Sequence, residues 1–261
     1  MAFDVKSALL PKNGCTPKEC EDAIAISPLR GRFAVADGAT EAYDSGRWAK
    51  LLARTWAHVE MLSFDIPTLL SSLHILGDRL ARRWITRELA WYEEEKAQSG
   101  AFAAFAALSV EDSAHEHGVY HWKAIALGDS CVFLEREKKL QAAIPIDSPS
   151  NFNYRPLLVP SSFREPMEPI VNKIMIRSDF SRAGDVFLLM TDAIACWYLS
   201  YVVHDERMHD EFHAAVSGKG PLGISDLIER ERTAGNLRND DVAILRVEIV
   251  NVTGSDPATY G

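Results

Sequence analysis

The stretch Arg32-Phe33-Ala34-Val35-Ala36-Asp37-Gly38 is a short apolar run that ends in an aspartate followed by a glycine. Three other parts of the chain also place acidic residues beside an apolar run, namely Glu21-Asp22, Val186-Phe-Leu-Leu-Met-Thr-Asp192 and Asn239-Asp240-Asp241-Val-Ala-Ile-Leu245. A carboxylate at the end of a buried strand is costly unless a positive charge lies against it. Several carboxylates that converge from different strands make an all-oxygen site of the kind that holds Mg²⁺ or Mn²⁺. The sequence therefore points to metal-assisted hydrolysis of a phosphoester.

The composition is that of an ordinary globular protein. Of the 261 residues 47% are hydrophobic, which is enough for one large core or two small ones. With 28 Lys+Arg against 37 Asp+Glu the formal net charge is −9, and no block of basic residues stands out. This charge disfavours binding to nucleic acid or to an anionic membrane. Because neither a linker nor an internal repeat is evident, we expect a single domain over residues 1–261.

The first residues, Met1-Ala-Phe-Asp-Val-Lys6, lack the basic region and the following apolar run of a signal peptide. No segment reaches the ~18 consecutive apolar residues expected of a membrane span. We therefore expect a cytoplasmic protein without a membrane partner. The cysteines form no Cys-x-x-Cys pair, so structural or incidental roles are expected for Cys15, Cys20, Cys131 and Cys196.

The first half of the chain predicts a hairpin followed by two helices. Residues 22–38 form two apolar runs around the turn residues Ser27-Pro-Leu-Arg-Gly31. A first helix is predicted over 45–56, where apolar residues recur on one helical face. A second and longer helix is predicted from Pro67 until Gly100 ends it.

The second half returns to strands. Apolar runs at 101–110, 119–128 and 130–135 predict an antiparallel meander, in which Gly128-Asp129 has the chemistry of a hairpin turn. Residues 145–183 are rich in Pro and Ser and predict a long loop with one strand at 173–176. The remaining elements are a strand at 186–190, helices at 194–216 and 223–234, a strand at 242–250 and a frayed tail from Asn251. Two antiparallel sheets that share one core, with helices on their outer faces, accommodate this order, and a generic α+β domain is the alternative.

Five short motifs in this order resemble those of the PP2C-type metal-dependent protein phosphatases. They are Glu21-Asp22, Ala36-Asp37-Gly38, Leu127-Gly128-Asp129-Ser130, Leu189-Met-Thr-Asp192 and Asn239-Asp240-Asp241-Val-Ala-Ile244. The resemblance extends from about residue 14 to residue 250. It implies an α+β fold of the αββα sandwich type, with two antiparallel sheets flanked by helices.

The resemblance also implies roles for individual residues. Asp37 resembles the aspartate that bridges two metal ions, and Gly38 the residue whose carbonyl oxygen joins the second ion. Asp192 and Asp240 resemble ligands of the first ion, and with Asp37 they form the predicted catalytic set. Glu21 resembles a ligand that acts directly or through water, with Asp22 beside it. The last member of the predicted set, at a weaker third metal site, is Asp129.

The chain departs from the family motifs at several positions. Ala39 stands where some family members have a histidine that serves as general acid, and Ala193 and Asp241 replace a usual Gly and Asn. The phosphate-binding arginine of the family has no match, and Lys18 is the nearest replacement by position. These departures favour an alternative in which the fold acts as a catalytically weak or inactive binding and regulatory module.

Structural explanations remain open beside the functional ones. Asp37-Gly38 alone is typical of a turn after a strand, Asp129 of a structural turn residue, and Glu21 of a surface carboxylate. His204, His209 and His213 are spaced to share a helical face, and we interpret that face as solvated rather than as a transition-metal site.

The sequence thus predicts an Mg²⁺- or Mn²⁺-dependent phosphatase that acts on phosphoserine or phosphothreonine in proteins. Two or three metal ions are expected, the third of them at Asp129. A phosphoprotein is the expected partner, with a Ser/Thr kinase as a second. Another alternative keeps the chemistry but takes a small phosphorylated molecule, and residues 145–183 are the expected place for that specificity.

Overall fold

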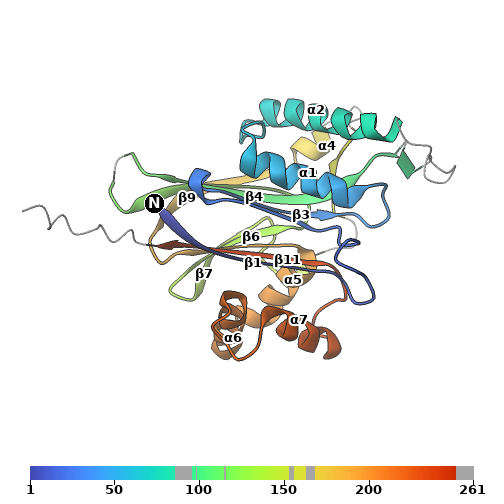
Figure 1. The fold of residues 1–261 in the computed structure, drawn as a ribbon. Coiled ribbons are helices and arrows are strands. Elements are labelled where there is room, and N and C mark those ends of the chain that lie inside the picture. The colour runs from blue at the N-terminus through green and yellow to red at the C-terminus, as the bar shows by residue number, and fades with distance from the viewer. Residues whose placement is uncertain (86–95, 98, 115, 153–155, 163–167, 251–261) are drawn as a thin grey trace, which may run out of the picture.

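The computed structural model describes residues 1–85, 96–97, 99–114, 116–152, 156–162 and 168–250. Two antiparallel sheets are stacked in the middle of the molecule, and helices cover their outer faces (Figure 1). The predicted αββα arrangement is therefore confirmed. Among the described residues, no helix is both long enough and apolar enough to cross a membrane.

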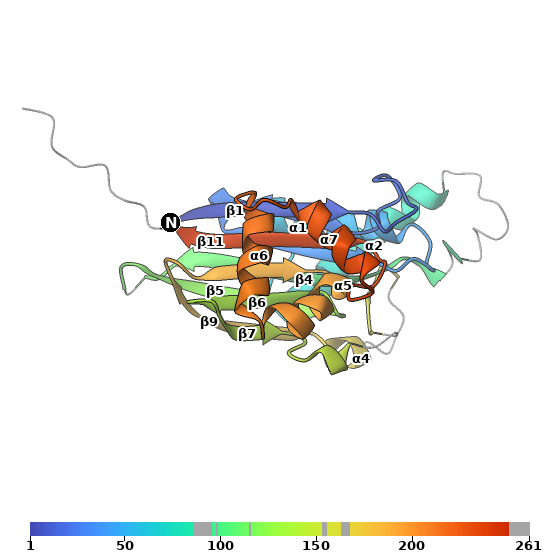
Figure 2. The same ribbon diagram turned by 90° about the horizontal axis from the view of Figure 1, so that it is seen from below.

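Sheet A has the strand order β1-β11-β10-β6-β7. Its strands are β1 (Ala2–Leu10), β6 (Cys131–Arg136), β7 (Lys139–Ile144), β10 (Val186–Met190) and β11 (Val242–Val250). Its outer face carries α5 (Asp192–Trp197), η3 (Tyr198–Val202), α6 (Glu206–Ser217) and α7 (Ile224–Thr233) (Figure 2).

Sheet B has the strand order β2-β3-β4-β5-β9, and β8 pairs with β4 outside this path. Its strands are β2 (Ala23–Ser27), β3 (Arg32–Gly38), β4 (Phe102–Asp112), β5 (Val119–Leu127), β8 (Val159–Pro160) and β9 (Met175–Arg182). Its outer face carries α1 (Ser45–His58), α2 (Ile66–Ile85) and α4 (Glu168–Val171) (Figure 1). Two short 3-10 helices, η1 (Pro28–Arg30) and η2 (Pro149–Asn151), lie in the connections between strands.

The alternation of β3 explains how this strand serves two layers of core. Because successive side chains point to opposite faces of a sheet, Phe33 and Val35 join the cluster between the sheets. Ala34 and Ala36 point to the other face and pack in the cluster that holds Trp48 of α1. Small alanines on that face let the helix approach the strand closely, and the end of β3 is thereby held rigidly at one end of the sandwich.

The predicted meander is wrong at Gly128-Asp129. β4 pairs with β5, but β5 belongs to sheet B whereas β6 belongs to sheet A. The segment is therefore a crossing between the two sheets and not a hairpin turn. Gly128 has a φ of +99°, and a Cβ on it would lie 2.6 Å from the Ala104 Cβ. The pair Gly128-Asp129 suits a hairpin turn as well as a crossing between two sheets, so the sequence alone does not distinguish these connections.

Other predicted boundaries change in simple ways. The predicted helix over 194–216 divides into α5, η3 and α6, because the Asp205 side chain accepts hydrogen bonds from the Arg207 and Met208 amides and caps α6. The described part of the second predicted helix is α2, and residues 86–95 lie outside the described residues, as does the tail from Asn251. The segment 145–183, predicted as a loop with one strand at 173–176, contains β8, α4 and β9. Strand β9 extends from Met175 to Arg182 and is therefore longer than the predicted strand.

Three strands were not predicted at all, namely the two-residue β8 and two longer strands of sheet A, β1 and β7. β1 pairs along its whole length with β11, from Ala2 opposite Val250 to Leu10 opposite Val242. β7 pairs with β6 across a register shift at Leu134/Glu135. Both strands lie at the borders of sheet A, where one side of the strand needs no partner and the apolar alternation is weak.

Candidate metal centre

Four strand ends bring acidic side chains to one end of the sandwich. Asp37 and Gly38 end β3, Asp129 lies on the crossing between β5 and β6, Asp192 follows β10, and Asp240 precedes β11. Asp37, Asp129 and Asp192 each offer a carboxylate oxygen within 4.8 Å of those of the other two. The structure thus gathers three of the predicted ligands directly. Asp240 lines the same pocket of about 420 Å³, together with Gly38, Thr40 and Arg238.

The carboxylates repel one another in surroundings of low polarity. Burial and the charges of neighbouring aspartates raise the pKa of Asp37 well above its usual range, and Asp22 is the first of those neighbours. Burial, followed by the charge of Asp192, raises the pKa of Asp129 to about 7. A site that holds several carboxylates against their own repulsion is arranged for a positive charge.

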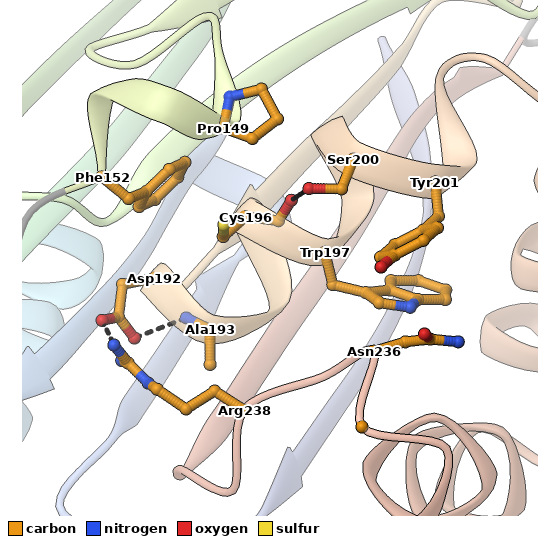
Figure 3. Close-up of a pocket in the computed structure, with 11 residues that line it drawn as sticks. Pro149, Phe152, Asp192, Ala193, Cys196, Trp197, Ser200, Tyr201, Asn236 and Arg238 are labelled. Carbon is orange, nitrogen blue, oxygen red and sulfur yellow. Dashed lines mark hydrogen bonds and ion pairs between the residues drawn. The ribbon is translucent and has the colours of Figure 1, made fainter.

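Arg238 supplies one such positive charge. Its Nη2 donates to Asp192 Oδ2 and lies 2.9 Å from Asp240 Oδ2. Figure 3 shows the Arg238 guanidinium beside the Asp192 carboxylate at the start of α5. Burial still raises the pKa of Asp192, with Arg238 acting in the opposite direction. Sequence reasoning missed Arg238, and its position two residues before Asp240 was the only signal.

Asp22 is more deeply buried than its neighbour Glu21. It is 1% exposed, its Oδ2 accepts a hydrogen bond of 2.8 Å from the Thr191 hydroxyl, and its Oδ1 has no hydrogen-bond partner. Burial raises the pKa of Asp22 well above its usual range. An orphaned carboxylate oxygen beside Asp37 is a costly arrangement that a bound cation relieves.

Glu21 lies at the border of the group and not within the set of three carboxylates. Burial raises the pKa of Glu21, a hydrogen bond with Thr40 lowers it, and the charges of Asp240 and Asp241 raise it further. Its backbone amide donates to Asp241 Oδ2 at 2.8 Å. The structure therefore places Glu21 beside Asp240 and Thr40, at a position suited to contact through water.

Asp241 stands where the motif usually has an asparagine, and its side chain forms hydrogen bonds with the segment that follows β1. Its Oδ1 accepts from the Lys12 amide at 2.8 Å and its Oδ2 from the Glu21 amide. The Lys12 Nζ donates to the Thr40 hydroxyl, 3.4 Å away. Lys12 therefore contacts the wall of the pocket through Thr40, whereas Lys18 is exposed.

Gly38 is required by a close approach of backbone to backbone. A Cβ on it would lie 2.6 Å from the Ser45 carbonyl carbon and 2.7 Å from the Ser45 carbonyl oxygen at the start of α1. The amide of the next residue, Ala39, donates to the Phe102 carbonyl at 2.9 Å. This packing fixes the end of β3, and with it the position of Asp37.

The donor set fits a hard divalent cation. All of the gathered side-chain donors are carboxylate oxygens, and Mg²⁺ and Mn²⁺ prefer such ligands. The raised pKa values of Asp37 and Asp129 and the orphaned oxygen of Asp22 are strains that a cation would remove.

A second pocket, of about 440 Å³, adjoins the first and shares Asp192 and Arg238 with it. Figure 3 shows aromatic side chains around this pocket, with Phe152 on one side and Tyr201 and Trp197 on the other. Tyr201 is 41% exposed, whereas Trp197 is buried. The acidic site therefore continues into a partly apolar surface.

Comparison with solved structures identifies the fold. The Mycobacterium tuberculosis serine/threonine phosphatase PstP/Ppp matches with a TM-score of 0.60 and 16% identity over 96% of this chain and 100% of that chain. The PstP catalytic domain in complex with two manganese ions matches with a TM-score of 0.62 and 16% identity over 96% of this chain and 99% of that one. PppA of Pseudomonas aeruginosa matches with a TM-score of 0.55 and 18% identity over 95% of this chain and 98% of that chain.

The chain has the fold of the PP2C-type phosphatases over nearly its whole length, and the predicted resemblance is confirmed at that level. No family model matches the sequence, and no curated protein matches it either. At 11–18% identity the solved structures establish the fold, and the chemistry has to be argued from the residues of the site.

Proposed function

We propose that this protein is an Mg²⁺- or Mn²⁺-dependent phosphatase that hydrolyses phosphoserine or phosphothreonine in proteins. The observation that carries the proposal is the group formed by Asp37, Asp129 and Asp192, whose carboxylate oxygens lie within 4.8 Å of one another in a pocket open to substrate. The manganese complex of PstP, which has the same fold, supports the choice of metal and a count of two ions.

The positions of the residues suggest which of them would bind each metal ion. Asp37, Asp192, Asp240 and the Gly38 carbonyl would hold two ions, with Glu21 acting through water and Asp129 at a third, weaker site. Such ions, when bound, lower the pKa of a shared water and neutralise charge on the phosphoryl oxygens. Ala39 carries no proton that could be donated to the leaving oxygen, so that proton has to come from solvent or from an acidic group of the site.

The aromatic pocket supports a peptide substrate over a small phosphorylated molecule. It begins at Asp192 and Arg238 and continues past Phe152 to Tyr201. A phosphorylated side chain in the acidic pocket would leave the neighbouring peptide residues over this apolar surface, which a small phosphoester would not reach. A partner kinase and a cytoplasmic location stay predictions.

The test is the release of phosphate from a phosphothreonine peptide, with and without millimolar Mn²⁺. Metal-dependent release is expected, and it should exceed release from a small phosphoester such as p-nitrophenyl phosphate in kcat/KM. The absence of release from a protein that still binds Mn²⁺ would favour the regulatory module. The absence of both would leave a likeness of fold alone.

Arg238 is expected to take the place of the missing phosphate-binding arginine. It is the cation at the junction of the two pockets, and an arginine pairs well with the oxygens of a phosphate. Arg238→Ala should raise KM for the phosphopeptide about 10- to 100-fold, which corresponds to one lost charged hydrogen-bonding partner. Initial-rate kinetics would measure this, and kcat should change less than KM.

Two comparisons make this prediction specific. Arg238→Lys should recover part of the loss, because a lysine keeps the charge but not the planar fork of donors. Arg207→Ala, which removes an exposed arginine from α6, should leave KM unchanged. A normal KM in Arg238→Ala would exclude the arginine from substrate binding.

A further inference from the structure

A second group of side chains that bind metals lies on the outer face of sheet A, under α6. Glu135 is near the end of β6, and His209 and His213 are four residues apart on α6, so they share one face of the helix. Figure 2 shows α6 crossing the strands of sheet A. The side chains of Glu135, His209 and His213 are 5%, 9% and 15% exposed. The interpretation of these two histidines as a solvated face is therefore wrong.

The three side chains point at one another. His209 Nε2 lies 3.0 Å from Glu135 Oε1, and His213 Nε2 lies 2.9 Å from Glu135 Oε2. The two imidazole ring centroids are 4.3 Å apart. Each residue offers a ligand atom within 4.8 Å of those of the other two.

Hydrogen bonding leaves part of this group unsatisfied. His213 Nε2 is a buried atom without a hydrogen-bond partner, although Glu135 lies close to it. The His209 nitrogen that faces Glu135 is Nε2, and its Nδ1 makes no hydrogen bond but lies 3.7 Å from Asp210 Oδ1. An imidazole nitrogen buried beside a carboxylate, in a geometry that makes no hydrogen bond, can bind a cation once the cation displaces its proton.

We propose that Glu135, His209 and His213 bind a divalent transition metal ion, with Zn²⁺ as the type. Two imidazoles and one carboxylate are a donor set that favours Zn²⁺ over Mg²⁺, in contrast to the all-oxygen set around Asp37. Tetrahedral Zn²⁺ with ligands at about 2.0–2.1 Å places its ligand atoms about 3.3 Å apart. The 3.0 and 2.9 Å separations run to different oxygens of Glu135. A rotation of the carboxylate, together with shifts of a few tenths of an ångström, would bring one oxygen and both nitrogens to that spacing.

Neighbouring groups support the carboxylate ligand. The Tyr198 hydroxyl donates to Glu135 Oε1, which fixes the orientation of the carboxylate. Hydrogen bonds of this kind commonly hold metal ligands in place. Tyr198 also packs with its ring 5.0 Å from that of Phe133, so the donor is itself held rigidly.

Arg246 is a positively charged neighbour of the group and opposes the binding of a cation. Its Nε donates to His213 Nδ1 at 3.3 Å, which favours the proton on Nε2. The same guanidinium pairs with Glu248 at 2.8 Å and lies 3.9 Å from Asp4, so it also has carboxylate partners. When His213 binds the metal through Nε2, its Nδ1 carries the proton and Arg246 shifts to these carboxylates.

The site is separate from the acidic pocket. Asp129 precedes β6 and Glu135 lies near its other end, so they are six residue steps apart along extended chain, or about 20 Å. The ion would fasten α6 to the sheet, and its binding does not depend on phosphatase activity.

Co²⁺ is the probe, because its visible absorption distinguishes a nitrogen-ligated site of low coordination number from six oxygen ligands. The test uses the full chain with Asp37→Asn, which weakens the acidic pocket but leaves this group intact. One equivalent of Co²⁺ should give visible absorption bands that Zn²⁺ removes in stoichiometric amount. Zn²⁺ should also raise the melting temperature by a few degrees.

Three further variants assign the bands. His209→Gln and His213→Gln should each weaken binding by at least about 100-fold, since even the loss of a supporting residue costs 10–100-fold. His204→Gln, which changes an exposed histidine just before α6, should bind as before. Circular dichroism would show whether each variant is folded.

Absence of these bands in the parent protein would overturn the proposal and leave an ion pair between Glu135 and the histidines. Bands that persist unchanged in both His209→Gln and His213→Gln would overturn it as well. The measurement on the parent protein decides the matter even if a variant fails to fold.

Discussion

Asp37→Asn is expected to lower metal-dependent phosphate release from a phosphothreonine peptide by about 10³-fold or more. The metal ions of such sites supply several kcal/mol of transition-state stabilisation, and each ~1.4 kcal/mol corresponds to a factor of ten in rate. Asp37 is the carboxylate that would belong to both ions, and its oxygen lies within 4.8 Å of those of Asp129 and Asp192. Removal of its charge should therefore weaken both sites at once.

The same substitution should not harm the fold without metal. The pKa of Asp37 is raised by burial and by four neighbouring aspartates, so the neutral amide relieves repulsion that the carboxylate suffers. Thermal unfolding in EDTA should show a melting temperature at or above that of the wild type. Asp78→Asn, at an exposed position on α2, is the matched control for the loss of one negative charge and should keep full activity. Activity of Asp37→Asn within a few-fold of the wild type would exclude the proposed centre.

The second large effect concerns the free energy of unfolding without metal, which is expected to fall as the pH rises from about 4 to about 7. The folded-state pKa of Asp129 is about 7, against a usual value of 3.8, so the folded protein binds this proton more tightly than the unfolded chain. The stabilisation is fully present below pH 3.8 and is lost as the pH rises through 7. A difference of this size corresponds to roughly 4 kcal/mol at most, or a decrease of about 10 °C in melting temperature for a chain of this length.

Mn²⁺ should reverse this trend, because the ion replaces the proton and binds more tightly as the carboxylates ionise. His209 also has a raised pKa, caused first by its hydrogen bond with Glu135, and loses stabilisation in the same direction as the pH rises. Asp129→Asn distinguishes these two contributions to the pH dependence of the stability. It should remove the contribution of the acidic pocket and leave that of His209. A melting temperature that does not depend on pH in EDTA, and does not respond to Mn²⁺, would contradict the carboxylate cluster.

The core strands could be predicted because their patterns are local. The strands β3, β10 and β11 are dense apolar runs with an acidic residue at or beside one end. This pattern can be recognised from the residues of each strand alone, without knowledge of its neighbours in the sheet. β1 was missed because Asp4, Lys6 and Ser7 interrupt its apolar residues, and its pairing with β11 joins the two ends of the chain. A pairing across more than 230 residues leaves no trace in a local window.

Contacts that join distant segments explain the other failures. Arg238 was overlooked because its role depends on Asp192, 46 residues away in the sequence. The sequence predicted a solvated His209 because α6 is polar. Its partner Glu135 lies on β6, 74 residues earlier in the sequence, and could not be recognised from the helix alone. Asp37 and Asp192 could be proposed in advance only because short motifs marked them, and their proximity still depends on the stacking of two sheets.

Strand β9 also bears on how the protein behaves at high concentration. It is the last strand of sheet B, and Met175, Ile176 and Phe180 on it are 43%, 39% and 58% exposed. Exposed edge strands with apolar side chains favour edge-to-edge association and aggregation. Three charged residues also lie on this strand, namely Arg177, Asp179 and Arg182. Association with a second copy would remove water from these charges, which costs free energy. The charges of these three residues therefore oppose edge-to-edge association through β9.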